Sequence, residues 1–211
     1  MGRRSLALAL LALLIWASAA GARTLPTKRL AVRQAAVTGI QSSQWKTWWG
    51  LQSYQGSSVV LSSAVPTSPA ETHSSLITTK MSWQDATISV DVTTQQQLRQ
   101  GSAPNPWEVG WLFFRFRDLA DYYWFMLKPT GFELGKKQGS DTQIFLVTGA
   151  LPATALGQTH RIQVRLQGPR IQVFVDGSKA VDYVDPHPLG NGAVGLYEED
   201  SQALFDSLSI S

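Results

Sequence analysis

The regular alternation of apolar and polar residues after Gln41 constrains the fold of this chain more than any other feature. In segments 86–94 and 160–167, Ile, Val or Leu recurs at every second position, with polar residues between them. Successive side chains of a β-strand point to opposite faces, so the pattern predicts strands with one buried face. No segment after Gln41 has the apolar spacing of an amphipathic helix. The chain is therefore predicted to be all-β.

A tight turn is predicted at Asp176-Gly177. The two residues separate two β-rich runs, and Asp-Gly in that position is typical of a hairpin with a type I′ turn. Further short apolar runs follow at 193–197 and 203–210. Many short strands at this spacing predict a sandwich or a barrel.

The first 22 residues have the organisation of a secretory signal peptide. Arg3 and Arg4 precede an apolar run from Leu6 to Trp16, and small residues at 20–22 form a cleavage site. An uncleaved membrane anchor is the alternative, but a run of about a dozen residues is too short to span a bilayer. We predict a signal peptide over 1–22, a linker over 23–40 and one β-sandwich domain over 41–211, in a protein secreted to the exterior or the periplasm.

The amino-acid composition excludes several classes of binding site and partner. The chain has no Cys, which excludes disulfides and thiolate sites. Without residues 1–22, it keeps 16 Lys and Arg against 15 Asp and Glu, and four of those cations lie between residues 23 and 33. The domain thus lacks the basic patch that nucleic acid requires. We expect a monomer that binds neither nucleic acid nor, after cleavage, a membrane.

Two aromatic runs, 107–117 and 122–128, predict a central hairpin with one apolar and one mixed face. Pairing Phe114 with Phe125 joins the apolar sets of the two strands. The same register places Arg115 beside Trp124 on the mixed face. A third strand from residue 132 adds Glu133 to that face and leaves a gap at Gly135.

The mixed face suits a carbohydrate, because indole rings stack on sugar rings and charged groups bond hydroxyls or carboxylates. All seven Trp residues beyond the signal peptide lie between Trp45 and Trp124. The alternative is that another segment covers this face and makes the Trp residues part of the core. The predicted ligand-binding set combines the mixed face with residues that flank it in sequence and with the loop pair Glu71 and His73. It consists of Glu71, His73, Trp107, Glu108, Trp111, Arg115, Trp124, Lys128, Glu133 and Lys136.

Catalytic signatures are weak. The G-x-S-x-G, H-E-x-x-H and P-loop motifs are absent, and the acidic run 198–200 lacks the E-x-D-x-E spacing of laminarinase-like sandwich hydrolases. Glu71 and His73 could form an acid/base pair or lie in a hydrated loop. His160 and His187 are interpreted as structural or exposed. No nucleophile is assigned, so enzymatic activity stays open.

Segments 107–137, 175–177, 192–197 and 205–208 together resemble concanavalin A-like jelly rolls of the laminin-G type. Over residues 41–211 the chain is most similar to 3-keto-disaccharide hydrolase-like domains, also described as family 16 glycoside hydrolase-like, and to levan-binding modules. The resemblance implies a two-sheet antiparallel β-sandwich with sugar binding on its concave sheet. It also implies a structural Ca²⁺ near the terminal strands in some members, for which Asp206 is a candidate ligand.

The leading hypothesis is a secreted jelly-roll protein that binds a poly- or oligosaccharide on a Trp-lined concave face. The second is a glycoside hydrolase acting on the same face through Glu71, His73 and Glu133. The third is a structural or adhesion module whose face is covered by a partner protein.

Overall fold

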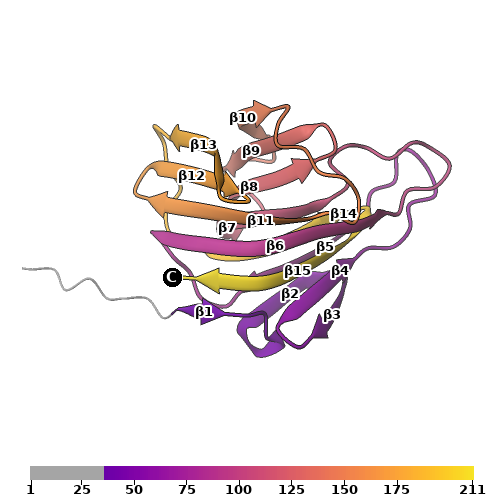
Figure 1. Ribbon diagram of the computed structural model, residues 1–211, viewed down its shortest axis with the longest axis horizontal. Coiled ribbons are helices and arrows are strands. Elements are labelled where there is room, and N and C mark those ends of the chain that lie inside the picture. The colour runs from indigo at the N-terminus through magenta and orange to yellow at the C-terminus, as the bar shows by residue number, and fades with distance from the viewer. Residues whose placement is uncertain (1–35) are drawn as a thin grey trace, which may run out of the picture. The chain divides into compact units, whose positions relative to one another are not determined.

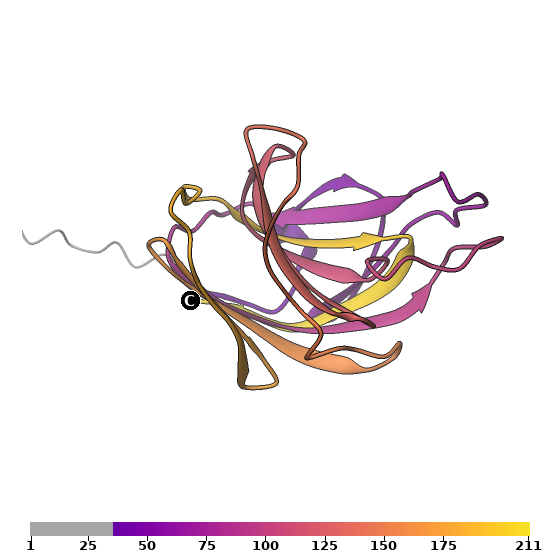
Figure 2. The same cartoon turned by 90° about the horizontal axis from the view of Figure 1, so that it is seen from above.

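The computed structural model describes residues 36–211, which form two antiparallel β-sheets packed face to face (Figures 1 and 2). The first sheet runs in the order β13 (Ser178–Val184), β12 (Arg170–Val175), β11 (Thr159–Gln167), β6 (Ala86–Gln97), β15 (Ser201–Ile210), β4 (Ser58–Ser62) and β3 (Leu51–Gln55), with β1 (Val37–Thr38) paired to β15. The second runs β10 (Ile144–Gly149), β9 (Gly131–Gln138), β8 (Asp121–Lys128), β7 (Gly110–Asp118), β14 (Ala193–Glu199), β5 (Ser74–Thr79) and β2 (Trp45–Trp49). The predicted all-β sandwich is confirmed.

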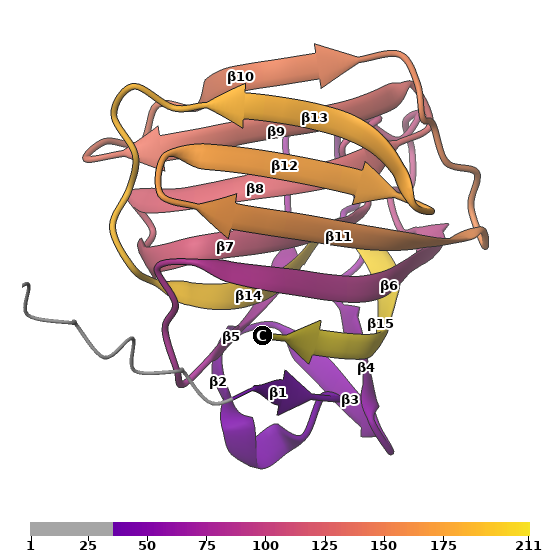
Figure 3. The ribbon, with the colours of Figure 1, turned by 60° about the vertical axis from the view of Figure 1, so that its left-hand side comes forward.

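The two sheets are held together by the alternating residues that the sequence pattern identified. Figure 3 shows β13, β12, β11 and β6 of the first sheet in front of β9, β8 and β7 of the second. Ile88 and Val164 of the first sheet and Leu112 and Phe125 of the second are fully or almost fully buried in one core. Burial of this apolar surface is the main favourable term in folding.

The second sheet is apolar on its outer face as well. A separate cluster of buried residues lies on that side and consists of Leu76, Val109, Trp111, Phe113, Phe116, Tyr122, Trp124, Met126 and Ala193, with Trp48, Trp49 and Tyr197 packed against it. An antiparallel sheet usually presents one polar face to water. An apolar outer face on this seven-stranded sheet is therefore unusual.

The predicted register of the β7–β8 hairpin is wrong by two residues. Leu112 pairs with Phe125 and Phe114 with Tyr123, because the ladder shifts between Phe114 and Asp118. Arg115 lies within this irregular stretch at a φ of 48°, in the left-handed region. The extra residues of a bulge turn the following side chains to the other face. Phe116 consequently joins the outer cluster, whereas unbroken alternation from Phe114 would have placed it in the core between the sheets.

Strand pairing begins before the predicted domain boundary, since Val37 of β1 pairs with Ile210 of β15. The predicted signal peptide 1–22 and the linker up to residue 35 lie outside the described residues. A single 3-10 turn, Ser42–Gln44, is the helical element of residues 36–211, and no helix there is long and apolar enough to cross a membrane.

The hairpin predicted at Asp176-Gly177 is confirmed. Val175 pairs with Ser178 across the turn, and Asp176 and Gly177 have φ angles of 50° and 81°. Both values are positive, as a type I′ turn requires.

Replacement of Gly177 by Val is expected to lower the free energy of unfolding by about 1 kcal/mol or more, because a β-branched residue is strained at positive φ. A Cβ at this position meets no atom within 4 Å, so the loss is conformational rather than steric. Urea unfolding measures it. Gly190→Val is the control, since Gly190 is equally open but has no positive φ. Equal free energies of unfolding for Gly177→Val and Gly190→Val would contradict a type I′ turn at Asp176-Gly177.

Candidate functional site

Two adjoining hollows lie on the outer face of the second sheet. One has a volume of about 410 Å³ and the other about 250 Å³. They share Trp111, Gln143 and Glu199, so they form one continuous depression, which we name the aromatic groove. Its other lining residues are Trp107, Met126, Lys128, Glu133 and Phe145 in the larger hollow and Trp49, Leu76, Phe113, Leu119, Tyr122, Lys137, Asp141 and Tyr197 in the smaller one.

Two aromatic rings are exposed in the wall of the larger hollow. Trp107, in the loop before β7, is 42% exposed, and Phe145 of β10 is 57% exposed. Between them, Trp111 contacts Tyr197 edge to face at a centroid distance of 5.3 Å. Apolar rings that line one hollow together, unlike single exposed apolar residues, are typical of ligand-binding grooves.

Trp124 has a different role from these rings, because it is fully buried. Its indole lies flat over Gly135, where a Cβ would come within 2.2 Å of the ring. The ring of Phe145 packs edge-on against it at 6.0 Å. The gap predicted at Gly135 is therefore filled by Trp124, which forms the floor beneath the groove and is not an accessible stacking surface.

The polar groups of the groove are few. Lys128 at the end of β8 forms an ion pair with Glu133 of β9. Glu199 at the end of β14 accepts a hydrogen bond of 2.8 Å from the Tyr197 hydroxyl and a further bond from the Trp107 indole. Burial raises the pKa of the Glu199 carboxyl, and repulsion from Asp200 raises it further. The groove thus combines aromatic rings with a carboxyl group, that of Glu199, whose pKa is raised.

Three successive carboxyl groups at the β14–β15 corner point to three different places. Glu199 lines the groove, Glu198 lies in the interior, and Asp200 enters a network at the end of the sandwich. Glu198 is fully buried, and one of its oxygens accepts bonds from Ser201 and Ser63 while the other has no partner. Burial raises the pKa of Glu198 to about 7.

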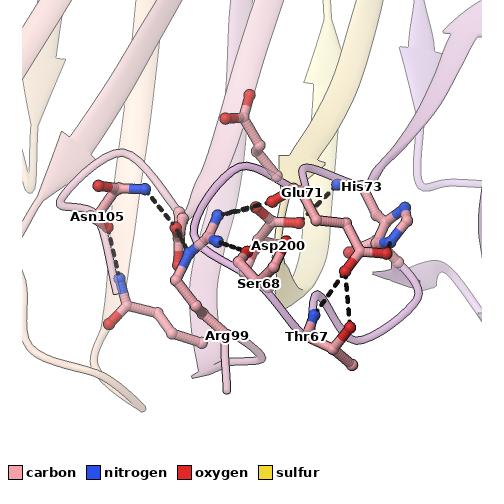
Figure 4. A network of polar contacts seen from close by, with 12 residues as sticks. Thr67, Ser68, Glu71, His73, Arg99, Asn105 and Asp200 are labelled. Carbon is pink, nitrogen blue, oxygen red and sulfur yellow. Dashed lines mark hydrogen bonds and ion pairs between the residues drawn. The ribbon is translucent and has the colours of Figure 1, made fainter. Parts of the chain in front are cut away.

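A buried arginine connects the loops behind the groove (Figure 4). Arg99 donates to Glu108 at 2.5 Å and to Asp200 at 2.6 Å, and all three side chains are at most 2% exposed. Asn105 also donates to Glu108, at 2.8 Å. Glu108 is adjacent in sequence to Trp107, and Asp200 is adjacent to Glu199. One guanidinium therefore holds the two segments that supply the groove with an exposed ring and a carboxyl.

The predicted pair Glu71 and His73 lies in the same network, outside the groove lining (Figure 4). Their side chains are 2.8 Å apart, and Thr67 donates to Glu71 from both its backbone and its hydroxyl. These hydrogen bonds lower the pKa of Glu71 to about 2. The backbone N–H of His73 donates a hydrogen bond to the Asp200 carboxylate, and the backbone carbonyl of His73 accepts one from the Asp200 N–H.

Arg115 was predicted on the Trp face and Lys136 in the ligand-binding set, but the structure places both elsewhere. Because of the bulge, Arg115 points to the loops at the sandwich end and donates to the carbonyls of Gln84, Gly168 and Leu189. Lys136 falls on the inner side of β9, where it donates to Asp185 at 2.8 Å. Neither cation lines the groove.

Of the predicted set, the groove brings together Trp107, Trp111, Lys128 and Glu133. Sequence reasoning missed Glu199, Gln143, Phe145 and Tyr197, because their approach depends on the pairing of β14 with β7 and of β10 with β9. The strand parity of Glu199 was a usable signal, since adjacent carboxylates on a strand must face opposite sides.

Asp206 does not stand in a set of metal ligands. Its carboxylate accepts a hydrogen bond from the backbone of Ser207, and residues 36–211 hold no group of three or more His, Asp or Glu side chains placed to bind a metal ion.

The chain belongs to the family of 3-keto-alpha-glucoside-1,2-lyase-like domains, whose model matches residues 37–211. This confirms the resemblance seen in the sequence. No curated protein matches the chain.

Solved structures share the fold at low sequence identity. A carbohydrate-binding module from Bacillus subtilis superposes with a TM-score of 0.64 at 17% identity, covering 80% of this chain and 96% of that one. A lichenase from a mouse hindgut metagenome gives a TM-score of 0.61 at 13% identity, covering 84% and 98%. A beta-glucanase of Bacillus licheniformis gives 0.59 at 12% identity, with the same coverage. Binding modules and hydrolases therefore share this jelly roll, and the fold alone does not separate them.

The two kinds of Trp should differ in their effect on stability. Trp124→Ala is expected to lower the free energy of unfolding by about 3–5 kcal/mol, because it removes a fully buried ring and leaves a cavity. Trp107→Ala should cost about 1 kcal/mol or less, since its ring is largely exposed. Chemical unfolding of both variants measures the difference. A Trp124→Ala protein as stable as Trp107→Ala would show that the floor is not packed as described.

Glu198 should make stability depend on pH. Its pKa is about 7 when folded and has an ordinary value of 4.5, so the folded protein holds this proton more tightly between those values. The contribution of Glu198 to stability is then greatest below pH 4.5 and is lost as the pH rises through 7. Between about pH 5 and pH 8, Glu198→Gln should gain about 2–3 kcal/mol relative to the parent protein.

The control for this titration is Asp182→Asn, because hydrogen bonds from Arg170 and Lys179 hold the pKa of Asp182 below its ordinary value of 3.8. Its stability relative to the parent protein should not change between about pH 5 and pH 8. Parallel pH profiles for Glu198→Gln and the parent would show that Glu198 is ionised in the folded protein.

Proposed function

We propose that this protein is exported from the cell and binds a saccharide chain in the aromatic groove. The observation that carries the proposal is the pair of exposed rings, Trp107 and Phe145, on a hollow whose centre holds Trp111 and Glu199. Ring faces pack against the C–H face of a sugar, and a few placed polar groups orient its hydroxyls. The carbohydrate-binding module of the same fold supports this choice of ligand.

Export rests on the residues at the N-terminus. The basic pair Arg3-Arg4, the short apolar run and the small residues at 20–22 are typical of a cleaved signal peptide. Cleavage should leave Arg23 as the first residue. A saccharide ligand suits a protein delivered outside the cell, where polysaccharides are abundant.

A second candidate function is cleavage of the bound saccharide, which the family description and the glucanases of the same fold suggest. One observation favours it: the Glu199 carboxyl lies in the groove with a raised pKa, which suits a group that donates or accepts a proton near neutral pH. Glu199 would take the role first given to Glu71 and His73. A structural or adhesion module is the third candidate and predicts no saccharide binding.

Trp107→Ala is expected to weaken saccharide binding about 10- to 100-fold, because it removes an exposed stacking surface. The full chain, expressed for export, is first screened on a glycan array, and affinity for the best ligands is then measured by calorimetry. Leu51→Ala is the matched control, since Leu51 is 66% exposed but lies on β3 of the first sheet.

Failure of every glycan to bind would contradict the proposal and favour the adhesion module. Mass spectrometry of the incubated glycans separates binding from cleavage. Shortened products that disappear in Glu199→Gln would establish the enzymatic alternative, whereas intact glycans with the parent protein would establish a binding function.

A further inference from the structure

We propose that the saccharide bound in the aromatic groove carries a protonated amine, and that this ammonium group lies against Glu199 beside the ring of Trp111. The ligand class is thus an amino sugar with a free amine. This inference rests on the proposed saccharide-binding function and specifies its ligand.

The charged residues that line the groove favour a cationic ligand. Lys128 is paired with Glu133, and Lys137 lies 3.7 Å from Asp141. Within residues 36–211, no Lys, Arg or His nitrogen lies within 4.0 Å of the Glu199 carboxylate, whose polar contacts are neutral donors. The lining therefore holds one carboxylate without a cation, and a ligand cation would supply the missing charge.

The residues behind Glu199 add to the negative potential. Among the described residues, Arg99 is the one cation in contact with both Glu108 and Asp200, and its charge also acts on Glu199, so one positive charge serves three carboxyl groups. One oxygen of Glu108 is buried without a hydrogen-bond partner. Burial raises the pKa of Glu199, and repulsion from Asp200 and Glu108 raises it further. A cation beside Glu199 would offset this repulsion and favour the ionised carboxylate.

The rings around Glu199 supply a second source of attraction for a cation. Trp107 and Tyr197 donate to the Glu199 carboxyl through N–H and O–H groups in their ring planes, so the edges of these rings point at it. Trp111 lines both hollows together with Glu199 and stands at an interplanar angle of 77° to Tyr197. An ammonium group beside Glu199 would therefore contact the indole of Trp111, whose face attracts cations most strongly where water is displaced.

The same charges disfavour acidic saccharides. A uronate or sulfate needs an unpaired cation, and both lysines of the groove lining are already committed to carboxylates. Arg115 and Lys136, which would have supplied such a cation, lie elsewhere. Lys128, which is paired with Glu133, is accordingly not expected to select acidic glycans.

The test uses four β-1,4-linked oligosaccharides of equal length, built from glucosamine, N-acetylglucosamine, glucose or glucuronic acid. Calorimetry with the full chain is run near pH 6, where a primary amine of this type is protonated. The glucosamine oligomer is expected to bind about tenfold or more tightly than the N-acetylated and glucose oligomers, and the glucuronic acid oligomer should bind most weakly.

Glu199→Gln should remove the preference for glucosamine while leaving affinity for the neutral oligomers within about threefold. Asp206→Asn is the matched control, because it also removes one negative charge, but from β15 of the first sheet. It should keep the full preference.

The outcomes separate this inference from the proposed function. Binding of the glucose oligomer at the same affinity as the glucosamine oligomer would overturn the amino-sugar inference and leave saccharide binding intact. A preference that survives Glu199→Gln would overturn the position assigned to the ammonium group. Failure of all four oligomers together with every glycan of the array would overturn both proposals.

Discussion

The ion pairs that Arg99 makes with Glu108 and Asp200 support the whole candidate site. All three side chains are buried, and a buried charge is tolerated only when it is paired and hydrogen-bonded. The two carboxylates come from different parts of the chain, and each is the sequence neighbour of a groove residue. The loop before β7 and the β14–β15 corner are therefore held at a defined separation, and with them the exposed ring and the free carboxyl of the groove.

The groove itself follows from a sheet with two apolar faces. One face of β7 and β8 closes the core between the sheets, and the other carries the outer aromatic cluster. Trp124 is a covered member of that cluster, because it packs onto Gly135 and lies under the ring of Phe145. Trp124 is thus part of the core, as the alternative interpretation of the Trp face predicted, whereas Trp107 remains open to solvent.

Charge pairing, more than the number of charges, defines what this groove can accept. Lys128 was the natural anchor for an acidic sugar as long as its neighbours were unknown. Once Glu133 neutralises it, the balance of the groove rests on Glu199, which has no basic partner among the described residues. An electrostatic preference of this kind depends on distances of a few ångströms, which strand pairing sets.

The sequence by itself determined the all-β class, the Asp176-Gly177 hairpin and the family, because strand alternation, turn chemistry and family motifs are local along the chain. It also determined that Trp107, Trp111, Lys128 and Glu133 belong to one surface. The register of β7 was decided by the bulge at Arg115, whose left-handed backbone has no signature in an apolar run. The approach of Glu199 to Trp107 was decided only by the tertiary structure, because it depends on a strand from the end of the chain pairing with one from its middle.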